Sequence, residues 1–405
     1  MKKAIGRILT CLIVLSFTGN LFAENDQPVN IHGFISQGYL QSTRNDFITD
    51  SEDGTWQFNE FALNFSYTPI EKLLISLQLF ARDLGSVGND DINVDFAFAD
   101  YRVWDMLGIR AGKMKNSSGL YGETRDVDML RTCIFLPMSV YDELLRDSDN
   151  TIQGVGIYGY FNTKILGSIN YQATLGTNNI SPESATSDYL EWGFTNITSV
   201  EMDTTQSYAL VYTDPTSVLR LGATAMFTEL HLDATARDSE IWKFLGVSSG
   251  DPILYDLKNT EIYTGSAELS FKDLIFTYEV KYSKARDLAM YTQTSPNPLF
   301  TKPIDLYGYY FMLTYQVNDF LEVSAYRDEF FPDRYNRDGK PLDFGLTRLQ
   351  HWMKKTAVSV KIEINPNWIM KVEGQYIDGA ANLLYETDPL KRYWWLYAAK
   401  LTYNF

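Results

Sequence analysis

Residues 274–283 read LIFTYEVKYS, and this stretch carries the pattern that decides the fold. Its even-numbered positions, from Leu274 to Tyr282, are all apolar or aromatic, whereas the odd-numbered positions include the charged residues Glu279 and Lys281. Successive side chains of a β-strand point to opposite faces, so this alternation predicts a strand with one apolar and one polar face. The same alternation recurs from end to end of the chain, most clearly at residues 61–67, 219–228 and 358–364.

Three features favour a membrane-spanning barrel over a soluble β-sandwich. The alternating runs are about ten to fourteen residues long, whereas soluble strands average about five or six and a tilted membrane strand needs about 9–11. Charged residues such as Arg220, Lys371 and Glu373 stand in mid-run, which is typical of a water-filled lumen. Aromatic residues such as Trp104 and Trp368 gather at the ends of the runs, where interfacial girdles form. The predicted fold class is therefore all-β, a transmembrane antiparallel β-barrel.

Sixteen such runs follow one another along the chain. They lie at residues 30–43, 55–68, 72–83, 93–103, 108–115, 151–161, 164–177, 204–213, 217–231, 258–271, 274–286, 303–317, 320–331, 352–364, 368–379 and 391–405. Every second connection is short and contains turn residues, as in Asn318-Asp319, whereas the others are long and mostly acidic. Short turns at one end and long loops at the other are typical of an outer-membrane barrel whose short turns are periplasmic.

The N-terminal residues predict how the protein is targeted. The composition argues against a nucleic-acid-binding protein and a helical membrane protein. Lys2, Lys3 and Arg7 precede an apolar run, which predicts a cleaved signal peptide at residues 1–23 and a single barrel domain at 24–405. Among the 405 residues, 51 are Asp or Glu and 35 are Lys or Arg, so the formal net charge of -16 argues against nucleic-acid binding. No stretch after the signal offers the ~18 consecutive apolar residues of a spanning helix.

The end of the chain resembles a known group of proteins. The last run carries Tyr403 and a terminal Phe405 on one face, which resembles the C-terminal strand of Gram-negative outer-membrane proteins. The sixteen-run pattern resembles the bacterial porins along the whole mature chain. Residues 110–115 and 119–126 are similar to the strand-to-loop region of phosphate-selective porin-like proteins, although the dense Lys and Arg ladder of anion-specific porins is missing. The resemblance implies a homotrimer in the outer membrane, in contact with lipid and lipopolysaccharide, whose third loop folds inward.

That third loop, residues 116–150, holds the charges that we expect at the pore constriction. They are Glu123, Arg125, Asp126, Asp128, Arg131, Asp142 and Glu143, and the expected lumen-wall bases are Arg82, Arg110, Arg220 and Lys281. Opposed charges across a narrow aqueous section create a transverse field that sorts ions by sign. The apolar residues 133–138 are expected to pack on the inner wall, the alternative being an ordinary surface loop. Because acids outnumber arginines in this loop, the sequence predicts passive diffusion of small hydrophilic solutes and ions with a weak cation preference.

Two other functions remain open at this level. A substrate-specific channel for sugars or anions would expose aromatic side chains to its solute, and the candidates are Tyr310, Trp394 and Trp192. A hydrolase at the outer rim would combine a histidine with Ser or Asp, and the candidates are His231 with Asp233 and Ser248, or His351.

Motifs for chemistry are weak. The string Gly246-Val247-Ser248-Ser249-Gly250 matches a nucleophile-elbow pattern but lies in a long loop without the strand-turn-helix context that the motif requires. The three histidines have no metal-ligand spacing, and no phosphate-cradling glycine loop is followed by Lys. The sequence therefore predicts neither enzymatic activity nor a metal or cofactor.

Overall fold

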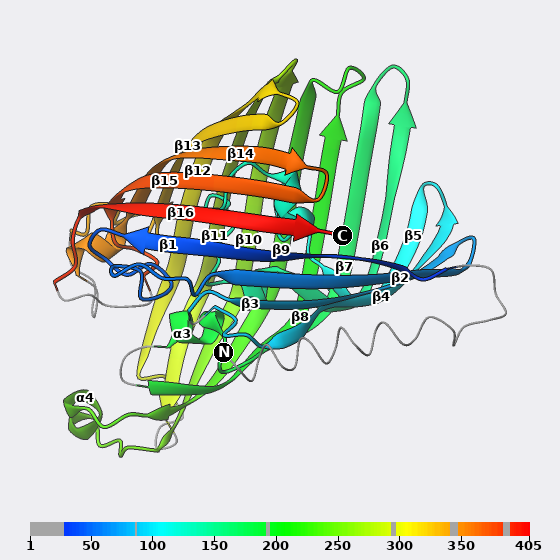
Figure 1. Cartoon of the computed structure of the whole chain (residues 1–405). Helices are drawn as coiled ribbons and strands as arrows, with labels where there is room; N and C mark the ends of the chain where they lie inside the picture. The colour runs from blue at the N-terminus through cyan, green and yellow to red at the C-terminus, as the bar shows by residue number, and fades with distance from the viewer. Residues whose placement is uncertain (1–27, 86, 192–194, 293–296, 341–346, 384–388) are drawn as a thin grey trace, which may run out of the picture.

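The computed structural model describes residues 28–85, 87–191, 195–292, 297–340, 347–383 and 389–405 (Figure 1). The predicted signal peptide and Trp192 lie outside the described residues. Sixteen antiparallel strands form one closed barrel in which each strand pairs with its neighbours in sequence and β1 pairs with β16. The strands are β1 (Asn30–Ser42), β2 (Asn59–Ile70), β3 (Leu73–Asp83), β4 (Ile92–Trp104), β5 (Leu107–Lys115), β6 (Thr151–Thr163), β7 (Gly167–Ile180), β8 (Thr195–Thr213), β9 (Leu219–Ala236), β10 (Pro252–Phe271), β11 (Leu274–Thr292), β12 (Phe300–Asn318), β13 (Leu321–Phe331), β14 (Met353–Asn365), β15 (Trp368–Gly379) and β16 (Tyr393–Asn404). The predicted strand number and closure are confirmed.

The two faces of each strand follow the predicted alternation. In β11, Thr277 is fully buried toward the lumen, whereas its neighbour Phe276 is 41 % exposed on the outside. The register pairs Phe276 with Leu313 of β12, which is also exposed. Outward side chains of adjacent strands therefore join into a continuous apolar surface.

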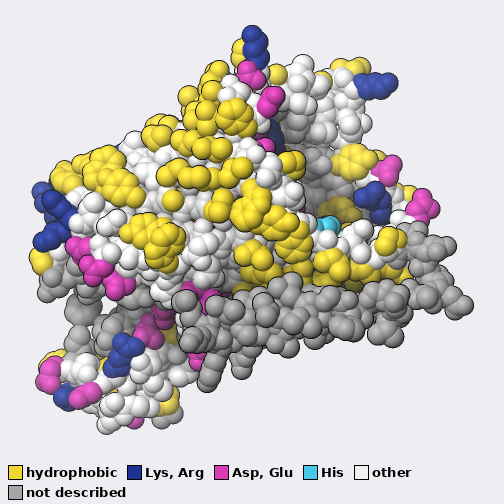
Figure 2. Space-filling view, in the orientation of Figure 1, with side chains coloured by type: hydrophobic (Ala, Val, Ile, Leu, Met, Phe, Trp, Pro, Cys, Tyr) yellow, Lys and Arg dark blue, Asp and Glu magenta, His cyan; other side chains and the backbone are white. Residues whose placement is uncertain are grey.

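Two aromatic girdles bound this apolar belt. At the turn end the ring centroids of Trp368 and Tyr403 lie 4.9 Å apart, and at the loop end those of Tyr376 and Trp395 lie 5.1 Å apart. Trp368 and Tyr376 are eight residues apart on β15, or about 26 Å along the strand, which at a strand tilt of about 35–45° is roughly 20 Å of height and close to the ~25 Å apolar band of transmembrane barrels. Figure 2 shows apolar side chains across this face, with charged side chains gathered toward the ends. The barrel is built to span a membrane.

Five neighbouring strands, β8 to β12, have 18 to 20 residues and are longer than the sequence predicted. On the loop side they form an extension whose inward side chains, including Val200, Leu232 and Ile253, pack around Trp242 of the short helix α4 (Glu240–Phe244). Figure 1 shows α4 at the outer tip, at the lower left. The prediction cut these strands short on the loop side, beginning β8, β10 and β12 too late and ending β9 and β11 too early, because it allowed only the length that crosses a membrane.

Helical segments are short and lie in the loops. Loop 116–150 contains the 3₁₀ helices η1 (Gly122–Thr124) and η2 (Asp128–Leu130) and the helix α2 (Arg146–Asp149). The helix α3 (Ala185–Leu190) and the 3₁₀ helix η3 (Arg348–His351) belong to other outer loops. In the part of the chain that the structure describes, no helix has the length and apolar character needed to cross a membrane.

Candidate functional site

Loop 116–150 connects β5 to β6 and lies inside the barrel, as predicted. At its start the Ser207 hydroxyl of β8 donates a hydrogen bond to the Asn116 side chain, at 2.6 Å. Further along, Asp128 forms an ion pair with Lys371 of β15, on the opposite side of the barrel, at 2.9 Å. The loop therefore crosses the lumen from wall to wall.

Asp128 is the centre of the first anchor. Lys371 and Lys400 lie 2.9 and 3.3 Å from its Oδ1, and Arg131 lies at 3.7 Å. The Thr402 hydroxyl donates to the other carboxylate oxygen at 2.7 Å. Burial by itself would raise the pKa of Asp128, but these three cations hold that pKa far below its usual range. The carboxylate is therefore charged, buried and fully paired.

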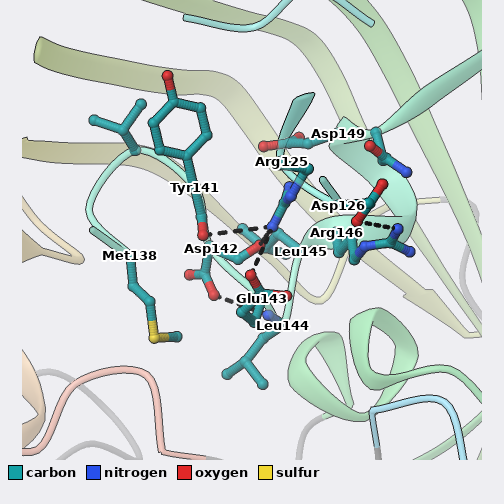
Figure 3. Close-up of polar contacts among 12 residues, drawn as sticks. Arg125, Asp126, Met138, Tyr141, Asp142, Glu143, Leu144, Leu145, Arg146 and Asp149 are labelled. Atoms are coloured by element: carbon teal, nitrogen blue, oxygen red, sulfur yellow. Dashed lines mark hydrogen bonds and ion pairs between the residues drawn. The ribbon is translucent and has the colours of Figure 1, made fainter. Parts of the chain in front are cut away.

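Glu143 forms the second anchor (Figure 3). Its two carboxylate oxygens accept from Arg82 of β3 at 2.8 Å and from Arg125 of the loop at 3.3 Å. Arg125 also donates to the carbonyl oxygen of Asp142, which ties two distant parts of the loop together. Burial opposes ionisation of Glu143, but the arginines lower its pKa well below the usual range.

Asp126 forms the third anchor near the outer ends of β4 and β5. It pairs with Lys115 of β5 and with Arg146 of the loop, the latter at 2.6 Å. Asp95 of β4 binds the same two cations, Lys115 at 2.5 Å and Arg146 at 3.4 Å. The two acids and two bases thus form a buried network in which each acid pairs with both bases. Sequence reasoning placed Asp126 in this site but missed Asp95, which a β-bulge in β4 turns inward.

Carboxylates of the wall also hold the loop backbone. Each of three wall acids accepts a hydrogen bond from a loop N–H group: Leu120 donates to Glu279 (2.8 Å), Ile134 to Glu373 (2.7 Å) and Ser139 to Asp328 (3.1 Å). Glu279 additionally accepts from the Tyr141 and Tyr310 hydroxyls, at 2.5 and 2.6 Å. The sequence identified Glu279 and Glu373 as wall charges but did not reveal that they accept hydrogen bonds from the loop backbone.

The lumen at this level is packed, which corrects the prediction of a watery lumen around the mid-strand charges. The side chains of Lys371 and Lys400 are each only 1 % exposed because the loop covers them. The apolar segment 133–138 packs on the inner wall, as predicted: Ile134 and Phe135 join a cluster of wall and loop residues. That cluster comprises, among others, Leu40, Phe47, Phe58, Met138, Leu144, Trp394 and Leu396. The sequence could not show that Lys371 and Lys400 are buried, because a buried, paired charge and a solvated charge occupy the same alternating positions of a strand.

The remaining predicted site residues lie apart from these anchors. Arg110 pairs with Asp100 of the neighbouring strand at 2.9 Å, and Arg220 lies 3.7 Å from Glu268. Glu123 is exposed and accepts a hydrogen bond from the loop's own Ser117. Of the expected lumen-wall bases, Arg82 and Lys281 meet loop acids, namely Glu143 and Asp149. The acids Asp126 and Asp128 instead face other cations.

Asp142 belongs to the loop, and Lys281 belongs to β11 of the wall. Asp142 accepts from the Asn382 side chain at 2.5 Å and from the Leu144 N–H at 2.9 Å. Burial raises the pKa of Asp142 to about 6. Lys281 pairs with Asp149 at 2.5 Å. Asp142, Lys281 and Asp149 all border a cavity of about 40 Å³ between the loop and β12.

The alternative sites are not assembled as the sequence suggested. Tyr310 and Trp394 are 0 % and 1 % exposed behind the loop, so in this conformation neither meets a passing solute. His231 pairs with Asp256 of the facing strand at 2.8 Å rather than with Asp233. Among the described residues, no group of three or more His, Cys, Asp and Glu side chains has the geometry to hold a metal ion.

The barrel matches solved structures of outer-membrane proteins over almost their whole length. Salmonella typhi OmpF, in complex with daunomycin, gives a TM-score of 0.55 at 14% identity and covers 94% of this chain and 98% of that chain. An anion-selective porin from Comamonas acidovorans gives 0.54 at 10% identity and covers 94% and 100%. This chain has the fold of the outer-membrane porins.

A third structure, the trimer form of OmpT, an outer membrane protein of Vibrio cholerae, gives a TM-score of 0.53 at 12% identity and covers 94% of this chain and 100% of that chain. No protein-family model matches the chain, and no curated protein matches its sequence. The structural likeness therefore establishes the porin fold, in which loop 116–150 is the element that crosses the lumen.

Proposed function

We propose that the protein is an outer-membrane porin through which small hydrophilic solutes and ions diffuse passively, with a weak preference for cations. The observation that carries this proposal is that loop 116–150 is held across the lumen of a membrane-spanning barrel. Buried ion pairs fix it to β3 and β5 on one side of the lumen and to β15 on the other. An element fixed in that position sets the width and the charge of the path. The protein performs no covalent chemistry in this proposal.

The expected cation preference is weak because loop charges and wall charges compensate each other. Seven acids and three arginines lie in the loop. Wall bases pair with the acids, namely Arg82, Lys115, Lys281, Lys371 and Lys400. The acids of the outer loops act over more than a Debye length of ~8 Å and are screened at physiological ionic strength.

Reversal potentials in a KCl gradient test this proposal. Asp128→Asn leaves Lys371, Lys400 and Arg131 without their common carboxylate, so the preference is expected to move toward anions. The control Glu183→Gln removes an exposed acid of an outer loop and is expected to have little effect. A strong anion preference of the wild-type channel, or no change on Asp128→Asn, contradicts the assigned role of the loop. Current steps that a specific solute blocks indicate a substrate-specific channel instead.

We also propose a homotrimer with lipid and lipopolysaccharide around its outer face. Support comes from the shared fold with the OmpT structure described as a trimer form. Cross-linking in mild detergent is expected to give a trimeric band, and exclusively monomeric protein contradicts the assembly.

A further inference from the structure

Loop 43–58 connects β1 to β2 and folds back into the outer half of the lumen. Its tip, residues 46–52, carries Phe47 and Ile48, which are both 0 % exposed. These two side chains belong to the apolar cluster that the inner wall shares with loop 116–150. Apolar side chains that fill a channel from an outer loop form a hydrophobic constriction, and such constrictions can gate a path.

Phe47 contacts both the inner wall and the loop that crosses the lumen. Its ring centroid lies 6.2 Å from that of Trp394 of β16 and 5.7 Å from that of Phe135. The Lys355 ammonium of β14 lies 5.0 Å from the Phe47 centroid. Trp394 and Lys355 belong to the buried, inward sets of their strands. Phe47 therefore occupies lumen that a solute entering from outside would have to cross.

The backbone of the tip is strained in this position. Ile48 has a φ of 64°, in the left-handed region that β-branched residues rarely adopt. Its carbonyl oxygen faces Gly85 of the next outer loop, where a Cβ would lie only 2.7 Å from that oxygen. Strained residues that persist only because their surroundings hold them are typical of switch regions. The strain therefore favours a second position of the tip.

Lys355 also favours a position in which the tip is withdrawn. It is only 2 % exposed, and its ammonium donates to the Met138 sulfur at 3.0 Å beside the Phe47 ring. Asp328 lies opposite Lys355 in the strand register but accepts from the Ser139 N–H. Within the described residues, no carboxylate oxygen lies within 4 Å of this ammonium. A buried ammonium without such a partner gains hydration when the tip leaves.

The tip is a compact unit that can move as one body. The Asp46 carboxylate accepts from the N–H groups of Ser51 and Glu52, each at 2.9 Å. Just before the tip, the Asn45 side chain exchanges two hydrogen bonds with the backbone of Lys391, at 2.7 and 2.8 Å. Withdrawal of the tip therefore keeps its internal contacts and breaks the contacts of Asn45.

We infer that the tip of loop 43–58 is a gate at the outer mouth of the path, closed in this structure, and that Phe47 is the side chain that closes it. This inference deepens the proposed function and rests on it. Burial of Phe47 and Ile48, together with the hydrogen bonds of Asn45, holds the gate closed. Strain at Ile48 and hydration of Lys355 favour its opening. Opposed contributions of this kind give an equilibrium between two positions.

Single-channel recordings in planar bilayers measure the ratio of open to closed time. Phe47→Ala is expected to raise this ratio by roughly tenfold or more, because it removes the buried ring that holds the tip inward. Phe47→Leu keeps an apolar side chain and should fall between this variant and wild type. The control Trp56→Ala truncates an aromatic side chain of the same loop that is 69 % exposed, so it should behave like wild type.

Asn45→Ala tests the gate with the ring left in place. It is expected to lengthen the open intervals without changing the current through one open channel, which a merely wider lumen would change.

A wild-type ratio in Phe47→Ala or, should that variant not fold, in Asn45→Ala overturns the inference. An equal increase in Trp56→Ala, or a wild-type channel that never closes, also overturns it. Absence of current from wild type and from every variant contradicts the proposed function itself, so the two failures are distinguishable.

Discussion

At the scale of single residues, neighbouring acids of loop 116–150 differ because their partners differ. Glu143 has two arginines against its oxygens, which stabilise its charged form. Asp142 has an amide and a backbone N–H, and burial dominates, raising its pKa to about 6 from 3.8. The two residues therefore contribute to stability with opposite signs at neutral pH.

Asp142→Asn is expected to stabilise the protein above pH 6. Below pH 4 the carboxyl is protonated in the folded and unfolded states, so its ionisation contributes nothing. Above pH 6 it is charged in both states, and only the folded state bears the cost of burying that charge. Stability is thus lost as pH rises from 4 to 6, by about 3 kcal/mol at 1.36 kcal/mol per pKa unit.

Urea unfolding in lipid vesicles at pH 7.5 and pH 4 measures this effect of Asp142. The gain for Asp142→Asn should be present at pH 7.5 and absent at pH 4. The adjacent control, Glu143→Gln, removes a paired charge and should destabilise at pH 7.5. A loss of stability for Asp142→Asn at pH 7.5 contradicts the assignment.

Phe276 tests which face of β11 meets lipid. Phe276→Arg should cost about 2–4 kcal/mol of unfolding free energy near the bilayer midplane, because an outward arginine must be desolvated in hydrocarbon. Phe276→Leu keeps an apolar side chain and serves as the control. Unchanged folding of the arginine variant into lipid vesicles refutes the assignment of this face.

At the scale of elements, Gly308 of β12 lets the loop approach the wall. A Cβ at this position would meet the Cβ and carbonyl oxygen of Ser139 at 2.7 Å. Gly308→Leu should therefore displace the loop around Ser139, cost about 1–3 kcal/mol by overpacking, and raise single-channel conductance. Gly265→Leu on β10 is the control, because its nearest neighbour is Val280 Cγ1 at 3.6 Å on the outer face. Equal conductance of both variants shows that this part of the loop does not limit the path.

The strands could be predicted from the sequence because a membrane barrel repeats one simple rule. The faces of β11 and the closure of β1 on β16 follow from alternation and from the order of turns and loops, whereas the inward third loop was implied by the resemblance to porins. The partners of Asp128 could not be predicted, since Lys371 and Lys400 are 243 and 272 residues away in sequence and only the barrel register brings them to one point. The outer extension was missed because alternation alone does not mark where a membrane ends.

At the scale of the whole molecule, the charges separate into two populations. Inside the barrel the loop acids Asp126, Asp128 and Glu143 pair with wall bases and are buried. The excess of acids that gives the net charge of -16 lies elsewhere, in large part in the outer loops, where Glu183, Asp188 and Glu191 are examples. A protein arranged in this way keeps an acidic outer surface and a nearly neutral path.

Closure by the last strand determines whether the barrel forms at all. Phe405 exchanges two backbone hydrogen bonds of 3.1 Å with Gly33, and β16 pairs along its length with both β1 and β15. Deleting residues 393–405 leaves two open edges in hydrocarbon, where each unpaired backbone group costs several kcal/mol. We therefore expect no folded barrel from this variant, as judged by heat-dependent gel mobility after refolding into vesicles.

The control is a circular permutant that links Phe405 to Asn30 and opens the chain at the turn before Asp273. It keeps every strand pair and should fold, which shows that folding requires the pairing of β16 and not a chain end at this position. A folded barrel from the deletion variant contradicts the requirement for closure.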